Sequence, residues 1–290
     1  MFSISLQQQQ YKTHILTDET TRSRLEVVPE RGGIITKWSI DGKDILYLDE
    51  ERFTNPDLSV RGGFPILFPI CGNLPNDTYT YDGKEYTLKQ HGFARNSSWE
   101  AHSVVSDEGV KIELTLNSNE ETKKVYPFDF RLCFTYKIYG NTLEIQQLYS
   151  NLSNSQTLVF SSGFHPYFLT VDKNQLQFEI PSGQYQDQST KEIHNFDGNF
   201  DFDRSEIDVG FQNLSANCAT VTDNSRKLKL QLDFDDTFST LVFWTLKGKN
   251  FYCLEPWTAN RNAINTKENL ISLEPEADYS TTVRLRADFF

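Results

Sequence analysis

Long apolar runs and paired cysteine spacings are both missing from this sequence of 290 residues. No segment approaches the roughly 20 consecutive apolar residues that a membrane-spanning helix needs. The first ten residues, MFSISLQQQQ, contain neither the basic region nor the apolar core of a signal peptide. We therefore expect a cytoplasmic protein. Cysteines lie far apart in or beside apolar stretches, which predicts free thiols at Cys71, Cys133, Cys218 and Cys253.

Basic residues are scarce, because 28 lysines and arginines stand against 40 acidic residues and leave a net charge of −12. Nucleic acids and anionic membranes both require a basic protein face, so we expect neither as a main partner. A small anionic substrate remains compatible with this charge if a few arginines gather locally.

Signatures of metals and nucleotide cofactors are missing as well. The five histidines are scattered, without an HxxxH pair or a His/Cys cluster in the sequence, so we expect no metal site. The patterns GxGxxG, GxxxxGK[ST] and GxSxG do not occur, which argues against a nucleotide cofactor and against a hydrolase triad of that type. Any chemistry is therefore expected to use side chains without a cofactor.

The sequence is rich in aromatic residues, with 22 Phe, 13 Tyr and 4 Trp, and its apolar residues often alternate with polar ones. Such alternation indicates strands with one buried face, and it occurs at residues 110–116, 134–138, 143–148 and 228–232. Residues 241–246 and 250–255 are more continuously apolar, as expected for strands covered on both faces. Asp41-Gly42 and Asp82-Gly83 are typical of hairpin turns.

Helical periodicity is weak throughout, and only a short helical turn is expected, around residues 266–270. The polar region of residues 182–208 is predicted to be the longest irregular segment. No linker or change of composition divides the chain. These features predict an all-β protein, a large antiparallel β-sandwich in a single domain of residues 1–290.

The first segment with functional potential is RGGFPILFPI, residues 61–70. Its glycines and prolines are expected to interrupt a sheet ladder and to turn the backbone so that it aims Arg61. An arginine beside a turn is usually only solvated. The similar Arg31-Gly-Gly lies between ordinary strand signals, so an RGG sequence alone is weak evidence of function.

The second segment is QHGFAR, residues 90–95, which places an amide, an imidazole and a guanidinium close together at Gln90, His91 and Arg95. A polar edge strand is the simpler interpretation. Arginine is nevertheless well suited to bidentate binding of carboxylate or phosphate, so Arg61 and Arg95 would form an anion clamp if they converge.

The third and fourth segments are SSGFHPYF, residues 161–168, and FYCLEPW, residues 251–257. His165 follows an apolar strand, where a histidine is more often a core group, but its titration near neutral pH suits catalysis. Glu255 ends a buried apolar run, where lost solvation raises a carboxyl pKa toward the range of a general base. Trp257 would supply a face for sugar stacking. Glu274 belongs to a polar turn, so Glu255 is preferred.

Taken together, RGGFPILFP, QHGFAR with the following Trp99, GFHPYF and CLEPW resemble the aldose 1-epimerase (galactose mutarotase-like) family, most closely its hexose-6-phosphate 1-epimerase branch. Each motif alone is loose, but all four occur in the expected order between residues 61 and 257. VVPERGG at residues 27–33 and TTVRL at residues 281–285 extend the likeness over almost the whole chain. The resemblance implies a twisted antiparallel β-supersandwich whose concave face binds a sugar.

The resemblance also implies an acid and a base. His165 would protonate the ring oxygen, and Glu255 would remove the proton from the anomeric hydroxyl, so that the ring opens and recloses on either face. For this reaction we expect a carboxylate and a protonated imidazole whose mutual attraction keeps both charged near neutral pH.

Binding residues follow from the same resemblance. Arg61 and Arg95 match the arginines that hold a 6-phosphate, and Gln90 and His91 would line the same pocket. Asp208, in EIDVGF at residues 206–211, is the best match to an aspartate that binds sugar hydroxyls. GFHPYF is shared with free-sugar mutarotases, so the phosphate preference depends mainly on the two arginines.

Two other functions remain open at this point. A free-aldose mutarotase would use the same acid and base on glucose or galactose. A non-catalytic carbohydrate-binding module on the same fold would bind sugar without accelerating its interconversion, although such a module has no need of a matched acid and base.

Overall fold

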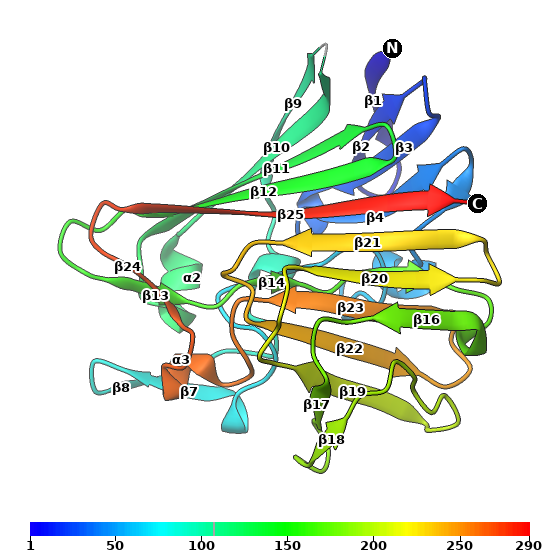
Figure 1. Ribbon diagram of the computed structural model, residues 1–290. Helices are drawn as coiled ribbons and strands as arrows, with labels where there is room; N and C mark the ends of the chain where they lie inside the picture. The colour runs from blue at the N-terminus through cyan, green and yellow to red at the C-terminus, as the bar shows by residue number, and fades with distance from the viewer. Residues whose placement is uncertain (107) are drawn as a thin grey trace.

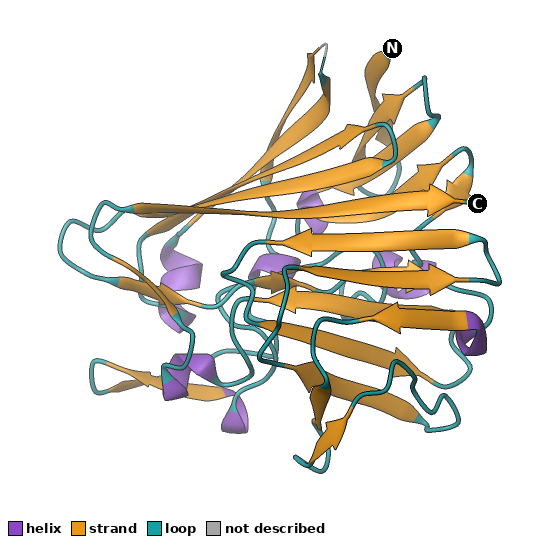
Figure 2. Cartoon of the chain, viewed as in Figure 1, coloured by secondary structure: helices purple, strands orange, loops and turns teal. Residues whose placement is uncertain are grey.

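The computed structural model describes residues 1–106 and 108–290, and strands dominate this part of the chain (Figures 1 and 2). All assigned pairings between named strands are antiparallel, so the predicted all-β class is confirmed. The strand predictions also hold, because residues 110–116 lie within a longer strand and the alternating segments near 134, 143 and 228 each lie in one.

One of two eight-stranded sheets carries the long twisted ribbons in the centre of Figure 1. In spatial order these are β16 (Leu176–Glu179), β20 (Cys218–Asp223), β21 (Leu228–Phe234), β25 (Asp278–Phe289), β12 (Thr142–Asn151), β11 (Phe130–Tyr139), β10 (Gly109–Asn117) and β9 (Glu100–Ser106). Along β11, every second residue is buried and the intervening ones are more exposed, which is the alternation expected of a sheet with one covered face.

A second sheet packs against this one and carries the functional residues. Its strands are β18 (Ile193–Asn195), β17 (Gln184–Asp187), β19 (Glu206–Phe211), β22 (Thr240–Leu246), β23 (Phe251–Trp257), β14 (Gly163–Phe164) and β6 (Ile66–Leu67), with β15 (Tyr167–Leu169) also paired to β23. All seven residues of β23 are buried, as predicted for this apolar run. Tyr252 and Leu254 join the main core, whereas the alternate residues Cys253, Glu255 and Trp257 face the other side.

The remaining strands form a third sheet and two two-stranded pairs. The third sheet contains β1 (Phe2–Gln8), β2 (Lys12–Asp18), β3 (Ser23–Val28), β4 (Ile34–Ile40) and β5 (Lys43–Asp44), and the pairs are β7 (Thr78–Tyr81) with β8 (Lys84–Thr87) and β13 (Leu158–Phe160) with β24 (Ile271–Leu273). The hairpin turns predicted at Asp41-Gly42 and Asp82-Gly83 are confirmed, because all four residues have positive φ and join β4 to β5 and β7 to β8.

Helices in the described residues are short. They are α1 (Glu50–Thr54), α2 (Glu120–Val125) and α3 (Ala263–Thr266), with 3₁₀ turns η1 (Pro29–Arg31), η2 (Pro75–Asp77), η3 (Ala94–Asn96) and η4 (Lys173–Gln175). The turn expected at residues 266–270 therefore lies slightly too late, since α3 ends at Thr266. Over the same described residues, none of these helices has the length or apolar character to cross a bilayer.

Two expectations about irregular segments were wrong. The polar region of residues 182–208 contains β17, β18 and the start of β19, because exposed polar strands at a sheet edge need only one packed face. The segment of residues 61–70 does enter a sheet ladder, since Ile66 and Leu67 pair with β14. Phe68 anchors this segment through aromatic contacts with Phe93, Tyr126, Phe130, Tyr149 and Phe160.

Candidate active site

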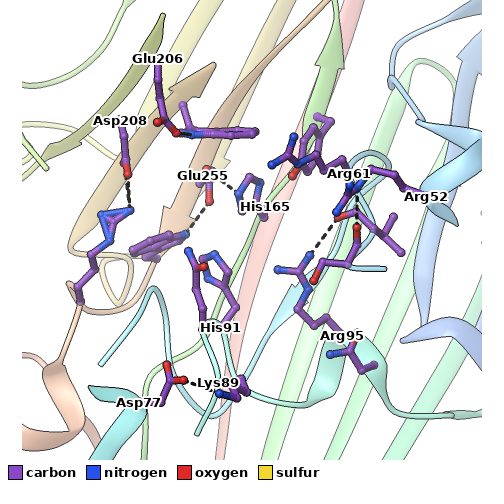
Figure 3. Close-up of a pocket in the computed structure, with 18 residues that line it drawn as sticks. Arg52, Arg61, Asp77, Lys89, His91, Arg95, His165, Glu206, Asp208 and Glu255 are labelled. Carbon is purple, nitrogen blue, oxygen red and sulfur yellow. Dashed lines mark hydrogen bonds and ion pairs between the residues drawn. The ribbon is translucent and has the colours of Figure 1, made fainter. Parts of the chain in front are cut away.

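A polar cleft of about 700 Å³ lies over the face of the second sheet that β23 presents away from the main core. Figure 3 shows its side chains in three groups, with Glu206 and Asp208 at one end, His165 and Glu255 in the middle, and Arg52, Arg61 and Arg95 at the other end. All eight residues singled out in the sequence line this cleft: Arg61, Gln90, His91, Arg95, His165, Asp208, Glu255 and Trp257.

His165 and Glu255 are brought together by strand register. Gly163 pairs with Trp257 and Tyr167 pairs with Cys253, so the same register places His165 opposite Glu255 on the neighbouring strand. The Nε2 atom of His165 lies 3.3 Å from Oε1 of Glu255. The two groups thus lie side by side on the floor of the cleft, rather than on opposite walls.

Trp257 positions the carboxyl group of Glu255. Its indole N–H donates a hydrogen bond to Oε2 of Glu255 at 3.1 Å. The Trp257 side chain is buried, and the guanidinium carbon of Arg261 lies 5.4 Å from its ring centroid. The ring therefore offers little free face for the sugar stacking expected from the sequence. Trp244, half-buried in the same cleft and held by a 2.7 Å bond from its indole N–H to Glu206, is better exposed for such a contact.

Burial governs the protonation of the pair. It lowers the pKa of His165, and the positive charge of Arg95 lowers it further. Burial likewise raises the pKa of Glu255, and the negative charge of Asp208 adds to this rise. Both shifts favour a neutral imidazole beside a protonated carboxyl group, so the charged pair expected from the sequence is the less favoured form, and it arises when Glu255 passes its proton to His165 across their contact. In the charged form and in the neutral form alike, His165 and Glu255 together hold one titratable proton.

His91 is fixed by the main chain of the segment that follows Phe68. Its backbone N–H donates to the carbonyl of Gly72 at 2.8 Å, and the backbone N–H of Gly72 donates back to Nδ1 of His91 at 3.1 Å. Because Nδ1 is the acceptor, the proton of the neutral ring belongs on Nε2. Burial lowers the pKa of His91 and keeps the ring neutral. Gln90, next to it, is exposed at the rim of the cleft.

Asp208 lies on β19, at the end of the cleft opposite the arginine group (Figure 3). Both of its carboxyl oxygens lie 3.0 Å from Nη2 of Arg261. Burial raises the pKa of Asp208, although the charge of Arg261 opposes that rise. The Nη1 atom of Arg261 is buried and has no hydrogen-bond acceptor within residues 1–106 and 108–290. Asp208 and Arg261 together therefore present an acceptor and a donor to anything bound there.

Arg61 and Arg95 converge at the other end of the cleft, as the clamp hypothesis requires (Figure 3). Nη2 of Arg95 donates to the carbonyl oxygen of Val60 at 3.1 Å, next to Arg61 in the chain. Arg31, by contrast, is buried and donates to the carbonyls of residues 55, 56 and 58, so it supports a loop and does not enter the cleft.

Sequence reasoning missed several cleft residues, namely Arg52, Trp244 and Arg261. Arg261 follows Trp257 by four residues, so extending the CLEPW segment to EPWTANR would have included it. Arg52 lies in the acidic stretch DEER and Trp244 within an ordinary apolar strand, and neither carries a local signal. Only the tertiary fold brings these two into the cleft.

A potential metal-binding group is present in space although no cluster exists in the sequence. Within the described residues, ligand atoms of His165, Cys253 and Glu255 lie within 4.8 Å of one another, and these are ligand types that zinc accepts. All four cysteines of the chain are free, and Cys253 is fully buried. Burial, followed by the charge of Glu255, raises the pKa of the Cys253 thiol, which favours the protonated form. We therefore interpret His165 and Glu255 in this group as an acid and a base in contact.

Comparison with known proteins identifies a family. A family model described as aldose 1-epimerase matches residues 14–286. Protein LacX (plasmid) from Lactococcus lactis subsp. lactis is 25% identical over 263 residues, covering 81% of this chain and 84% of that protein. A protein of Cenchrus ciliaris with the provisional name glucose-6-phosphate 1-epimerase is 24% identical over 280 residues, covering 88% of this chain and 79% of the relative.

Solved structures agree with the fold. The Slr1438 protein from Synechocystis sp. PCC 6803 is 42% identical, with a TM-score of 0.95 over 100% of both chains. A galactose 1-epimerase from Lactobacillus acidophilus NCFM superposes with a TM-score of 0.74 at 15% identity, covering 99% of this chain and 98% of that one. A galactose mutarotase-like protein from Clostridium acetobutylicum reaches a TM-score of 0.84 at 18% identity, with 100% and 99% coverage. The predicted galactose mutarotase-like sandwich is therefore confirmed.

Proposed function

The chain belongs to the aldose 1-epimerase family, and from this premise we propose that it interconverts the α and β anomers of a hexose 6-phosphate such as glucose 6-phosphate. The observation that carries the proposal is the contact between His165 and Glu255 in a cleft with a cationic end. The curated relative with the name glucose-6-phosphate 1-epimerase points to the same substrate class.

Ring opening needs one proton removed from O1 and one delivered to the ring oxygen, O5. These two oxygens share the anomeric carbon, so they lie only two bonds apart. An acid and a base separated by 3.3 Å can reach both without lying on opposite sides of the sugar. His165 protonates O5 as Glu255 accepts the O1 proton, and the C1–O5 bond breaks to give the open-chain aldehyde. After rotation about C1–C2, the same protons move back and the ring closes on the other face.

The shared proton explains why burial helps this reaction. At ring opening the pair passes from carboxylate and imidazolium to carboxylic acid and neutral imidazole, which is the form that burial favours. The cleft thereby offsets part of the energy of the open-chain state. The indole N–H of Trp257 acts in the other direction, because its hydrogen bond stabilises the carboxylate needed to start the reaction.

The two ends of the cleft orient the substrate. Asp208 and Arg261 offer a hydrogen-bond acceptor and a donor to the sugar hydroxyls, while Arg61 and Arg95 bind the phosphate. Gln90 lines the exposed rim of the cleft, and the ring of His91 packs edge-on against that of His165. With the phosphate held at the cationic end, the anomeric carbon lies over the catalytic pair.

The test compares mutarotation of glucose 6-phosphate, glucose and galactose by polarimetry or NMR exchange. Arg61→Gln and Arg95→Gln are each expected to lower kcat/KM for the phosphorylated sugar about tenfold or more, the loss of a hydrogen bond to a charged group, with little change for glucose. Arg286→Gln, which removes a surface arginine paired with Asp288, serves as the charge control.

Other outcomes identify the alternatives. Equal losses for phosphorylated and free sugars would indicate a free-aldose mutarotase. Saturable sugar binding without acceleration by the wild-type protein would indicate a carbohydrate-binding module and contradict the proposed catalysis.

A further inference from the structure

The cationic end of the cleft contains a third arginine, Arg52, beside Arg61 and Arg95 (Figure 3). Throughout residues 1–106 and 108–290, no ion pair joins any of these three guanidinium groups to a carboxylate. The other cations of the cleft differ, because Lys89 pairs with Asp77 and Arg261 pairs with Asp208. Three guanidinium groups without a salt bridge therefore gather at one end of the cleft in a strongly acidic protein.

The main chain of residues 59–61 holds the three arginines together. Nε of Arg52 donates to the carbonyl of Ser59 at 3.0 Å, and Nη2 of Arg95 donates to the next carbonyl, that of Val60, at 3.1 Å. Arg61 is the following residue. Ser59 thus holds the guanidinium of Arg52, Val60 holds that of Arg95, and the next residue, Arg61, carries the third.

The loop before this segment is also fixed. Arg31 donates to the carbonyls of Asn55 and Leu58 at 3.0 and 2.8 Å, which anchors the connection between α1 and Ser59. At the start of α1, the side chain of Asp49 accepts a hydrogen bond from the backbone N–H of Arg52 at 3.1 Å. Arg52 is therefore presented by a supported turn and tethered at its Nε atom.

Gathering like charges is unfavourable unless an anion compensates them, and the neutral carbonyls of Ser59 and Val60 do this only in part. Burial lowers the pKa of Arg95, so a positive charge there is costly without an anion. A carboxylate or sulfate ester brings one negative charge to this end. A phosphate monoester has the same three terminal oxygens as a sulfate ester, one for each guanidinium, but brings nearly two negative charges near neutral pH.

We propose that Arg52 is a third phosphate-binding residue and that the three-arginine end selects the dianionic form of a phosphate monoester over monoanionic esters. This inference rests on the proposed function, since it refines how that same substrate is recognised. The inference adds Arg52 to the phosphate-binding residues. It also adds a requirement for a doubly charged ester, which binding by Arg61 and Arg95 alone does not imply.

Isothermal titration calorimetry measures this selection directly. A sugar sample already at anomeric equilibrium gives no net reaction heat, so the active enzyme can be used. The ligands are glucose 6-phosphate, glucose 6-sulfate, which stays monoanionic, and glucose. The proteins are the wild type, Arg52→Gln, Arg61→Gln, Arg95→Gln and the control Arg286→Gln, with thermal unfolding reporting intact folding.

The wild type is expected to bind the phosphate at least tenfold more tightly than the sulfate at about pH 7.5, because the second negative charge strengthens the hydrogen bonds to three guanidinium groups and one such charge-assisted bond is worth about that factor. At about pH 5 the dianion falls to roughly one-tenth, so phosphate affinity should drop about tenfold while sulfate affinity stays nearly constant. Arg52→Gln should reduce both the preference for phosphate and its pH dependence.

Two failures are distinguishable. If Arg52→Gln keeps the wild-type ratio of phosphate to sulfate affinity while Arg61→Gln and Arg95→Gln reduce it, the role of Arg52 is refuted and the proposed substrate stands. If the wild type binds both esters no better than glucose, the phosphate substrate itself is wrong and the inference falls with it.

Discussion

Replacing Glu255 with glutamine is expected to abolish catalysis while making the folded protein more stable at alkaline pH. Glutamine has nearly the shape of glutamate, and its amide oxygen can still accept the hydrogen bond from Trp257. The amide cannot take a proton from O1. Loss of a general base lowers kcat by about 10²–10⁴-fold, so the variant should retain at most about one-hundredth of the wild-type rate.

The stability effect follows from the raised pKa of Glu255, which has a buried side chain. A carboxyl group whose pKa is higher in the folded state binds its proton more tightly there than in the unfolded chain. Its contribution is therefore present at low pH and is lost as pH rises from the unfolded pKa through the folded one. Each unit of that shift corresponds to about 1.4 kcal/mol. Glutamine does not titrate, so the variant avoids this loss.

The assay combines NMR exchange rates with urea unfolding at a series of pH values from about 4 to about 9, a span that covers ordinary and raised carboxyl pKa values. The difference in unfolding free energy, variant minus wild type, should grow with pH. Glu274→Gln is the matched control, because Glu274 also precedes a proline but is exposed. A variant with more than a tenth of the wild-type rate, or a stability difference independent of pH, would refute the reasoning.

Two further substitutions test the positioning of the pair and of the sugar. Trp257→Phe removes a hydrogen-bond donor that lowers the pKa of Glu255, so the pKa of Glu255 should rise further. The pair then keeps its single proton to higher pH, and the alkaline limb of the kcat/KM profile should move to higher pH. A limb that stays in place or moves to lower pH contradicts the assignment. Gly72 has positive φ and packs against the side chain of Arg261, so Gly72→Ala should displace Arg261 from Asp208. The KM values for glucose and glucose 6-phosphate should both rise by about tenfold, the cost of one lost charged hydrogen bond. An effect confined to the phosphorylated sugar would count against a role of Arg261 in binding the sugar hydroxyls.

The sequence predicted the elements whose evidence is local. Alternation in β10, β11, β12 and β21 gave their positions because each strand has one covered face, and the two Asp-Gly turns follow from residues that tolerate positive φ. β6 was missed because Pro65 and Pro69 flank Ile66 and Leu67, whose short ladder depends on a partner strand far along the chain.

In the candidate site, too, some residues could be predicted from local sequence and others could not. His165 and Glu255 each carry local signals, and their contact follows from a register between β14, β15 and β23 that a single sequence does not state. Arg52 and Trp244 have no local signature, because their place in the cleft depends on how α1 and β22 pack. The protonation of the pair was mispredicted because depth of burial outweighs the attraction between two charges.

The strand register that joins His165 to Glu255 has a consequence for how specificity can change. The distance between His165 and Glu255 is set by main-chain pairing in the interior of a sheet, whereas Arg52, Arg61 and Arg95 come from α1, the loop before β6 and η3. Under the proposed function, proton transfer and phosphate recognition are therefore encoded in separate parts of the molecule. Substitutions at the three arginines would change the preference for phosphorylated over free sugars while the reacting atoms keep their spacing.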